Sequence, residues 1–188
     1  MAGGVFFDLD GTLQDTAPDF IDCVQQLRRE LQLQAMDEYL IREQVSNGSL
    51  ALTALACGLP PDDPIIAPLQ QRLLELYDRV LGDNAPLFAG LETALAWLES
   101  KQIPWGIITN KPWRYTEPLL AKKTWPFTPS CVICPEHVSQ PKPAPDGLLL
   151  ACEQTGCEPS ESWYLGDHSR DIEAGIAAGM QTAMCHWG

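Results

Sequence analysis

The sequence predicts an α/β fold: a doubly wound parallel sheet interrupted, after its first strand, by a small helical domain. Three observations support this prediction. Residues 5–9 form a nearly continuous apolar run, which is typical of a strand buried on both faces. Residues 16–85 show helical periodicity and contain no convincing strand. From residue 86 onwards, short apolar runs alternate with helical segments, which is the pattern of parallel βαβ units.

The helical segment is expected to contain two long and two short helices. Apolar residues recur at near-helical spacing in two places. They are Phe20, Val24, Leu27, Leu31 and Leu33, and then Leu69, Leu73, Leu76, Tyr77 and Val80. Shorter helices are expected over about 40–45 and 49–57, and the proline-rich segment 58–64 breaks the chain after them. We therefore expect 16–85 to be a domain of its own, with 1–15 and 86–188 forming the α/β core.

The remaining elements of the core follow in regular alternation. Strands are expected over 105–108, 131–134, 163–165 and 182–185, and helices over 91–98, 115–122, 147–154 and 172–178. Because a helix separates each strand from the next, consecutive strands are expected to run parallel.

Composition argues against several kinds of partner. The 25 acidic residues against 12 basic ones give a net charge of −13, whereas nucleic acids and anionic membranes attract clustered Lys and Arg. Taken alone, this charge also argues against a small anionic substrate. No apolar run reaches the roughly 18–20 residues of a membrane span, and the N-terminus lacks the basic region of a signal peptide. The seven cysteines have no framework spacing, so we expect reduced thiols and a cytoplasmic protein.

Polar residues follow the ends of four predicted strands. They are Asp8 and Asp10 after the first strand, Thr109 and Asn110 after the second, Lys142 after the third, and Asp167 and Asp171 after the fourth. In doubly wound sheets, ligands bind at the carboxyl ends of the strands. We therefore expect these side chains to converge at one edge of the sheet.

The acidic pair near the N-terminus suggests a metal site. Asp8 and Asp10 are two residues apart, so in extended chain they project to the same side. Close carboxylates repel each other unless a cation lies between them, and with Asp167 they would form an oxygen-rich pocket suited to Mg²⁺. An Asp-x-Asp pair by itself is more often an acidic surface turn, so the prediction depends on the other strand ends.

The order and context of these residues resemble the four motifs of the haloacid dehalogenase superfamily of phosphatases. Residues 7–16 closely resemble the first motif, Ile108–Asn110 the second, Lys142 between two prolines the third, and Gly166–Asp171 the fourth. All four occur in order, and the resemblance covers nearly the whole chain. It implies a Rossmann-like core, with residues 16–85 as a small helical cap.

The resemblance also implies a reaction, the hydrolysis of a phosphomonoester through a covalent aspartyl-phosphate. Asp8 would attack phosphorus as an already ionised carboxylate that needs no separate base. Asp10 would protonate the leaving oxygen and then accept a proton from water. Thr109, Asn110 and Lys142 would bind the phosphoryl group.

Mg²⁺ is the cofactor that the resemblance implies. Its ligands would be Asp8, the backbone carbonyl of Asp10, Asp167, and Asp171 either directly or through a water. Together with Lys142, the metal would make the local charge positive, so the net charge of the chain does not exclude a phosphate ester. Simpler interpretations stay open for single residues: Lys142 as an exposed loop charge, and Asp171 as a partner of its helix dipole.

The surroundings of the motifs resemble the phosphoglycolate phosphatase branch, and more closely the bacterial N-acetylmuramate 6-phosphate phosphatases of peptidoglycan recycling. A small phosphate ester is therefore the expected partner. Candidate contacts to its headgroup are Ser46, Asn47 and Gly48 in the cap, and Lys111 and Arg114 after the second motif. The first three can instead be an ordinary interhelical turn, and the two cations can be solvated surface charges.

The sequence leaves other functions open. One is a phosphoglycolate phosphatase or a broader sugar-phosphate phosphatase, and another is a non-catalytic protein that binds Mg²⁺ or phosphate. A receiver-type signalling domain is disfavoured by the long helical insertion after the first strand. Members of the family continue beyond the position of Gly188, so the core is expected to be shortened by about one strand and one helix. The expected oligomeric state is a monomer or a weak dimer.

Overall fold

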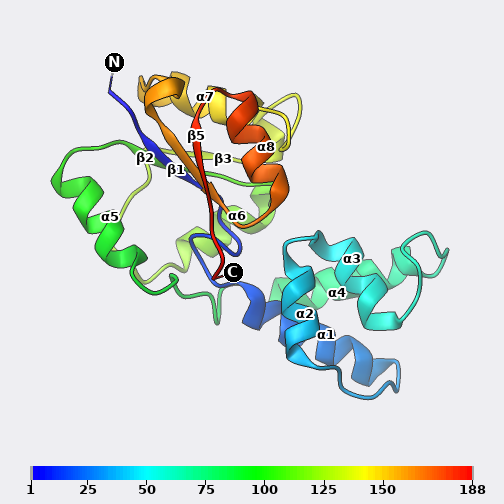
Figure 1. Cartoon of the computed structure of the whole chain (residues 1–188). Coiled ribbons are helices and arrows are strands. Elements are labelled where there is room, and N and C mark those ends of the chain that lie inside the picture. Colours follow the sequence, from blue (N-terminus) through cyan, green and yellow to red (C-terminus); the bar gives the residue numbers. More distant parts are fainter. Residues whose placement is uncertain (1, 188) are drawn as a thin grey trace. The chain divides into compact units, whose positions relative to one another are not determined.

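The computed structural model describes residues 2–187. By its internal contacts the chain divides into two compact units, Met1–Asp15 with Pro86–Gly188, and Thr16–Ala85. We call the first the α/β unit and the second the helical unit (Figure 1). Within residues 2–187, no helix has both the length and the apolar character needed to cross a membrane.

A five-stranded sheet forms the centre of the α/β unit. Its strands are β1 (Val5–Phe7), β2 (Trp105–Ile108), β3 (Cys131–Ile133), β4 (Trp163–Gly166) and β5 (Gln181–Met184). All neighbouring strands pair in parallel, in the order β3-β2-β1-β4-β5. The predicted doubly wound parallel sheet is therefore confirmed, with β1 at its centre.

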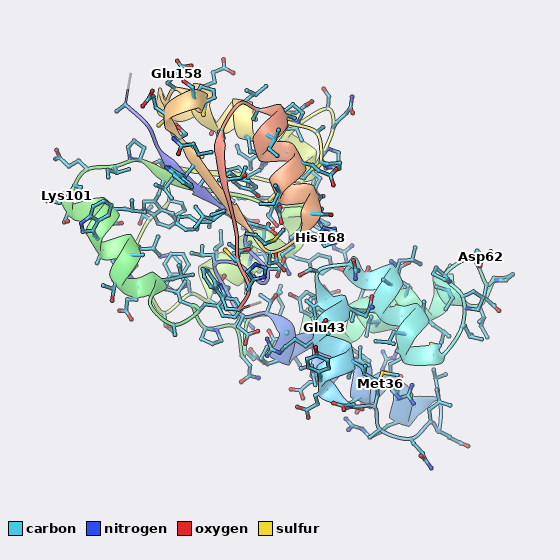
Figure 2. The ribbon with its side chains drawn as sticks, viewed as in Figure 1. Met36, Glu43, Asp62, Lys101, Glu158 and His168 are labelled. Carbon is cyan, nitrogen blue, oxygen red and sulfur yellow. The ribbon has the colours of Figure 1, made fainter. Side chains whose placement is uncertain are left out.

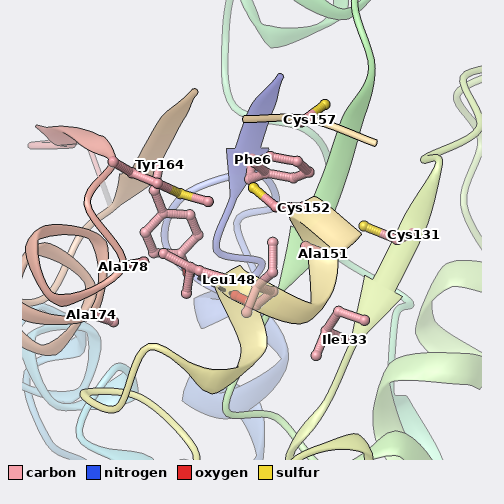
Figure 3. Close-up of a cluster of buried hydrophobic side chains, with 12 residues drawn as sticks. Phe6, Cys131, Ile133, Leu148, Ala151, Cys152, Cys157, Tyr164, Ala174 and Ala178 are labelled. Atoms are coloured by element: carbon pink, nitrogen blue, oxygen red, sulfur yellow. Dashed lines mark hydrogen bonds between the residues drawn. The ribbon is translucent and has the colours of Figure 1, made fainter. Parts of the chain in front are cut away.

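Two helices, α7 (Asp146–Thr155) and α8 (Ser169–Ala177), pack against one face of the sheet. Side chains from both helices and from four strands meet there in one buried cluster (Figure 3). It includes Phe6, Cys131, Ile133, Leu148, Ala151, Tyr164 and Ala174. Right-handed crossovers require α5 (Leu91–Ser100) and α6 (Trp113–Ala121) to lie on the opposite face (Figure 1). Short 3₁₀ turns at Pro135–His137 and Pro159–Glu161 lie in the loops before and after α7.

The first strand is shorter than the apolar run that predicts it. After Phe7, the backbone N–H of Asp8 still donates to the carbonyl of Leu165, with 2.8 Å between nitrogen and oxygen. The chain then turns through Gly11, whose φ of 77° lies in the left-handed region that favours glycine. The strand therefore ends at Phe7, directly before Asp8, and Leu9 remains buried beyond it.

The helical unit consists of four helices that pack on one another. They are α1 (Ala17–Glu30), α2 (Glu38–Val45), α3 (Gly48–Cys57) and α4 (Ile66–Val80). In its core, the rings of Phe20 and Tyr77 stack with 4.0 Å between their centroids. The apolar spacing thus located all four helices within a few residues.

One part of the predicted apolar stripe is wrong. Leu31 and Leu33 lie beyond the end of α1 and are 36% and 40% exposed. The helix stops because Gln32 takes a left-handed conformation, with φ at 57°, and the N–H of Leu33 turns back to the carbonyl of Arg28. A leucine beyond this turn cannot continue the buried face of the helix.

Candidate active site

The carboxyl ends of the strands bring most of the predicted residues of the α/β unit to one edge of the sheet. Figure 2 shows His168, which follows β4, at this edge, whereas Glu158 lies at the opposite edge, where the strands begin. Asp8 directly follows β1, Thr109 follows β2, and Asp167 follows β4. The parallel register of these strands is what places the three side chains next to one another.

The ammonium group of Lys142 is the electrostatic centre of the site. Its Nζ lies 2.9 Å from Oδ1 of Asp8 and 2.6 Å from Oδ1 of Asp171. It also donates to the carbonyl of Ile108 at 3.1 Å and to the hydroxyl of Tyr164 at 2.8 Å. Only 2% of the Lys142 side chain is exposed, so the interpretation of this residue as an exposed loop charge is wrong.

Asn110 holds the loop that carries Lys142. Its side-chain Nδ2 donates to the backbone carbonyl of Lys142 at 2.8 Å, and its Oδ1 accepts from the backbone N–H at 3.0 Å. Asn110, Lys142 and the buried Thr109 line one small recess at the ends of β2 and β3. Phosphate binding by Asn110 stays a prediction, and the structure gives its amide a positioning role.

Among the described residues, Asp8, Asp167 and Asp171 form a cluster able to hold a metal ion. Each can offer one carboxylate oxygen, and these oxygens lie within 4.8 Å of one another. A Cβ at Gly11 would come within 2.4 Å of Oδ2 of Asp167, and one at Gly166 would come within 2.2 Å of Asp171. Glycine at both positions therefore lets the carboxylates approach, and an all-oxygen donor set fits a hard divalent cation.

Burial changes the electrostatics of Asp8. Loss of solvation raises the pKa of its carboxyl from 3.8 to about 7; the Lys142 ammonium lowers that pKa, and the Asp171 carboxylate raises it. The expectation that Asp8 is ionised at neutral pH without help is therefore incomplete. Further positive charge beside it would favour the carboxylate form.

Asp171 serves two purposes. Its Oδ2 accepts the backbone N–H of His168 at 3.0 Å, which caps the first turn of α8, while its Oδ1 pairs with Lys142. The side chain is fully buried. One oxygen of the Asp171 carboxylate thus serves the helix end and the other pairs with Lys142, and coordination of Mg²⁺ by Asp171 stays a prediction.

Of the two cations after the second motif, Lys111 is buried, whereas Arg114 is exposed, as its interpretation as a surface charge expects. The ammonium of Lys111 pairs with Oδ1 of Asp10 at 2.9 Å, and the Lys111 side chain is 6% exposed, so its interpretation as a solvated surface charge is wrong. The guanidinium of Arg114 lies 4.4 Å from the centre of the Tyr115 ring and donates to the Tyr115 hydroxyl. Contact of either cation with a substrate stays a prediction.

Ser46, Asn47 and Gly48 form the turn between α2 and α3 in the helical unit. Ser46 is the C-cap of α2, Asn47 is the N-cap of α3, and Gly48 begins α3 with φ at 87°. The Asn47 amide donates to Oε1 of Gln44 at 3.0 Å. The interhelical-turn interpretation is therefore correct, and a role in headgroup binding stays a prediction.

Sequence reasoning missed Tyr164 and Thr12. The Tyr164 hydroxyl is buried beneath the site and donates to the carbonyl of Ile108 at 2.7 Å, and burial raises its pKa well above the ordinary value. The Thr12 hydroxyl donates to Oδ1 of Asp167 at 3.3 Å. A tyrosine inside a buried parallel strand was an available signal, because its hydroxyl must find a partner there.

Comparison with known proteins agrees with this geometry. Residues 5–185 match the model of the haloacid dehalogenase-like hydrolase family. The chain is 41% identical to the N-acetylmuramic acid 6-phosphate phosphatase of Pseudomonas aeruginosa, over 98% of this chain and 81% of that protein. It is 36% identical to the phosphoglycolate phosphatase of Xanthomonas campestris pv. campestris, over 98% of this chain and 83% of that protein.

Solved structures show the same fold. The crystal structure of a predicted phosphoglycolate phosphatase from Haemophilus somnus 129pt superposes with a TM-score of 0.82 at 22% identity, covering 100% of this chain and 86% of that one. A haloacid dehalogenase superfamily hydrolase from Geobacter sulfurreducens superposes with a TM-score of 0.75 at 19% identity, covering 97% and 86%. The sequence match, the fold and the four motifs agree, and the chain belongs to the haloacid dehalogenase-like hydrolase family.

Proposed function

We propose that this protein is a Mg²⁺-dependent phosphomonoesterase that hydrolyses a small phosphate ester through an aspartyl-phosphate on Asp8. The observation that carries the proposal is the Lys142 ammonium held between Asp8 and Asp171, beside a cluster of three carboxylates. A buried nucleophile flanked by a fixed cation is suited to attack on a dianionic phosphate. Relatives named as phosphatases in the same family support the same reaction class.

The first step would transfer the phosphoryl group to the protein. An oxygen of the Asp8 carboxylate forms a bond to phosphorus while the bond between phosphorus and the leaving oxygen breaks. The leaving oxygen keeps the bonding pair and takes a proton from Asp10. The Thr109 hydroxyl and the Lys142 ammonium donate to the phosphoryl oxygens and stabilise their charge.

The second step would return the nucleophile. A water oxygen attacks phosphorus, and Asp10, now a carboxylate, accepts the proton of that water. The bond from phosphorus to Asp8 breaks, and its electron pair returns to the Asp8 carboxylate. Inorganic phosphate is released, and both aspartates regain their starting states.

Asp8, Asp167 and Asp171, with the backbone carbonyl of Asp10, would hold Mg²⁺. When bound, the ion would neutralise phosphoryl charge and favour the ionised form of Asp8. The donor set supports this assignment because it consists of carboxylates brought together by two glycines that leave no room for a Cβ.

N-acetylmuramate 6-phosphate is the substrate that we propose, in a cytoplasmic enzyme of peptidoglycan recycling acting as a monomer or weak dimer. Two relatives with this activity in their names are 41% and 40% identical to the chain, whereas the phosphoglycolate phosphatases compared are 36% identical. The residues proposed to contact the headgroup are Ser46, Asn47, Gly48 and Arg114. A broader sugar-phosphate phosphatase is the second candidate, because polar turn residues of this kind can accept several small phosphates.

Phosphate release from a panel of esters tests the proposal. N-acetylmuramate 6-phosphate, 2-phosphoglycolate and hexose 6-phosphates would be compared in Mg²⁺ and in EDTA. We expect Mg²⁺-dependent release, fastest with the first ester, and a loss of roughly 10³-fold or more for Asp8→Asn, because the nucleophile is removed. Asp62→Asn, in the exposed loop between α3 and α4 (Figure 2), should leave the rate unchanged.

Two outcomes would contradict the proposal. Equal activity of the wild type and Asp8→Asn would show that Asp8 is not the nucleophile. No release from any ester by a folded protein would favour a non-catalytic protein that binds Mg²⁺ or phosphate.

A further inference from the structure

We propose that Lys111 is a positioning residue that holds the carboxylate of Asp10 in the orientation needed for proton exchange with the leaving oxygen. The inference rests on the proposed phosphomonoesterase function. It assigns Lys111 to the reaction itself and not to recognition of the substrate headgroup.

The contact between the two side chains is short and largely shielded from water. Nζ of Lys111 lies 2.9 Å from Oδ1 of Asp10, with 6% of the Lys111 side chain and 19% of the Asp10 side chain exposed. An ion pair this enclosed is screened by salt much less than a pair on the surface. Its two residues are 101 positions apart in the sequence, so the pair joins the first motif to the residue that directly follows the second.

Lys111 is itself anchored at its backbone. Its N–H donates to the hydroxyl of Thr109 at 3.1 Å, and its carbonyl accepts from the hydroxyl of Thr116 at 3.2 Å. Thr116 is fully buried in α6, and Thr109 is the proposed phosphoryl ligand. The ammonium therefore projects from a fixed point, which is the condition for it to fix a second side chain.

Proton transfer depends on orientation. A general acid must lie within about 2.6–3.2 Å of the oxygen that it protonates, and a carboxylate that rotates spends part of its time outside that range. An ammonium that donates to Oδ1 restricts the rotation of the whole carboxyl group, and it can do so in the protonated form as well, because Oδ1 still accepts while Oδ2 carries the proton. Replacement of Lys111 should therefore weaken the step that uses the Asp10 proton and leave binding of the phosphoryl group in place.

Esters with different leaving groups distinguish an effect on proton transfer from a general structural effect. A sugar alkoxide is a poor leaving group and needs a proton as it departs, whereas p-nitrophenolate and acetate depart as stable anions. Loss of an oriented acid should thus slow sugar-phosphate hydrolysis selectively. A residue with only a structural role would slow all esters alike.

The experiment measures kcat/KM for N-acetylmuramate 6-phosphate or a hexose 6-phosphate, and for p-nitrophenyl phosphate and acetyl phosphate. This constant reports the steps up to departure of the leaving group, whereas kcat also contains hydrolysis of the aspartyl-phosphate. For Lys111→Met we expect a loss of about tenfold or more on the sugar phosphate, and a change within about threefold on the activated esters. Lys111→Arg should recover part of the loss, because it keeps the cation.

The double variant Asp10→Asn with Lys111→Met tests whether the two residues contribute to the same step. With the acid removed, Lys111→Met should change the sugar-phosphate rate by less than about threefold, because the two substitutions remove the same contribution. Lys101→Met, at an exposed position at the end of α5, controls for the loss of a positive charge. Lys111→Gln serves as a second neutral variant.

Each variant is judged by the ratio of its kcat/KM values for two esters, measured on one preparation. This ratio does not depend on the fraction of the protein that is folded.

An equal loss on all esters, or a loss confined to KM, would overturn the inference while leaving the phosphomonoesterase intact. Hydrolysis of no ester by the wild type would instead reject the proposed function, and the inference with it.

Discussion

The ammonium of Lys142 has three N–H bonds and lies near four acceptors, which are Asp8, Asp171, the Ile108 carbonyl and the Tyr164 hydroxyl. The two carboxylates attract it most strongly, so the neutral acceptors decide where between them it lies. Tyr164 is suited to this because its own proton is directed to the Ile108 carbonyl. Its lone pairs are then turned toward the ammonium.

Removal of the Tyr164 hydroxyl tests its part in placing the Lys142 ammonium. We expect Tyr164→Phe to lower kcat/KM about tenfold, because the ammonium loses one of its fixed acceptors. The free energy of unfolding should fall by about 1 kcal/mol, the usual cost of one buried hydrogen bond. Steady-state kinetics and urea denaturation would measure the two effects.

The matched control is Tyr39→Phe, which removes a hydroxyl from a side chain that is 64% exposed. It should change neither quantity. If Tyr164→Phe behaved like this control, the hydroxyl would have no part in placing Lys142.

Within the helical unit, Asp19 links α1 to the segment that directly follows α4. The side chain is fully buried; its Oδ2 accepts the N–H of Gly82 at 2.7 Å, and its Oδ1 accepts the N–H of Asn84 at 2.9 Å. These two N–H groups lie beyond the end of α4 at Val80, outside the hydrogen bonds of the helix itself. One carboxylate therefore closes the helical unit where its first and last helices meet.

Substitution of Asp19 should destabilise this unit. Asp19→Ala leaves two partly buried hydrogen bonds without their acceptor, and we expect a loss of about 1–3 kcal/mol in the free energy of unfolding. Asp19→Asn keeps one acceptor oxygen and should lose less. Urea denaturation followed by circular dichroism measures both, and equal stability of the three proteins would contradict the role given to Asp19.

The elements themselves could largely be predicted from the sequence. Parallel strands are buried on both faces, so their apolar runs are continuous, and the strand over 105–108 was located without error. Element ends were predicted less well, because they depend on individual hydrogen bonds. The end of α1 is set by the left-handed Gln32, which no apolar spacing indicates.

At the scale of the whole molecule, burial governs the chemistry of the cysteines. All seven are free thiols, and only Cys57 is partly exposed. Loss of solvation raises the pKa of Cys23 and of Cys131 to about 12, and of Cys152 to about 11. A raised thiol pKa keeps the unreactive protonated form until the pH rises through that value.

Alkylation therefore reports on global unfolding. At about pH 8, iodoacetamide should label Cys57 first and the six buried thiols only as the protein unfolds, whereas in urea all seven should react together. Mass spectrometry of timed samples measures the pattern, and Cys57→Ser should remove the fast phase. Rapid labelling of Cys131 or Cys152 in the native protein would contradict the burial described.

Net charge is the global property that gave the weakest guide to function. A chain at −13 was expected to avoid anions, yet three of its acids gather around a site that also holds Lys142, and a fourth pairs with Lys111. Local arrangement decides which charge a ligand meets, because salt screens distant surface charges, whereas buried charges close to the ligand are screened much less.

The sequence by itself determined the order of strands and helices along the chain and the insertion after the first strand. It also determined the four motifs, whose acids, threonine and lysine meet at one edge of the sheet. These follow from apolar periodicity and from the rule that parallel strands end together. Only the tertiary structure decided the partners: Lys111 with Asp10, Tyr164 with Lys142, and Asn110 with the backbone of the lysine loop. It also decided the raised pKa of Asp8. Partners and pKa values depend on which groups packing excludes from water, and that exclusion involves residues far apart in the chain.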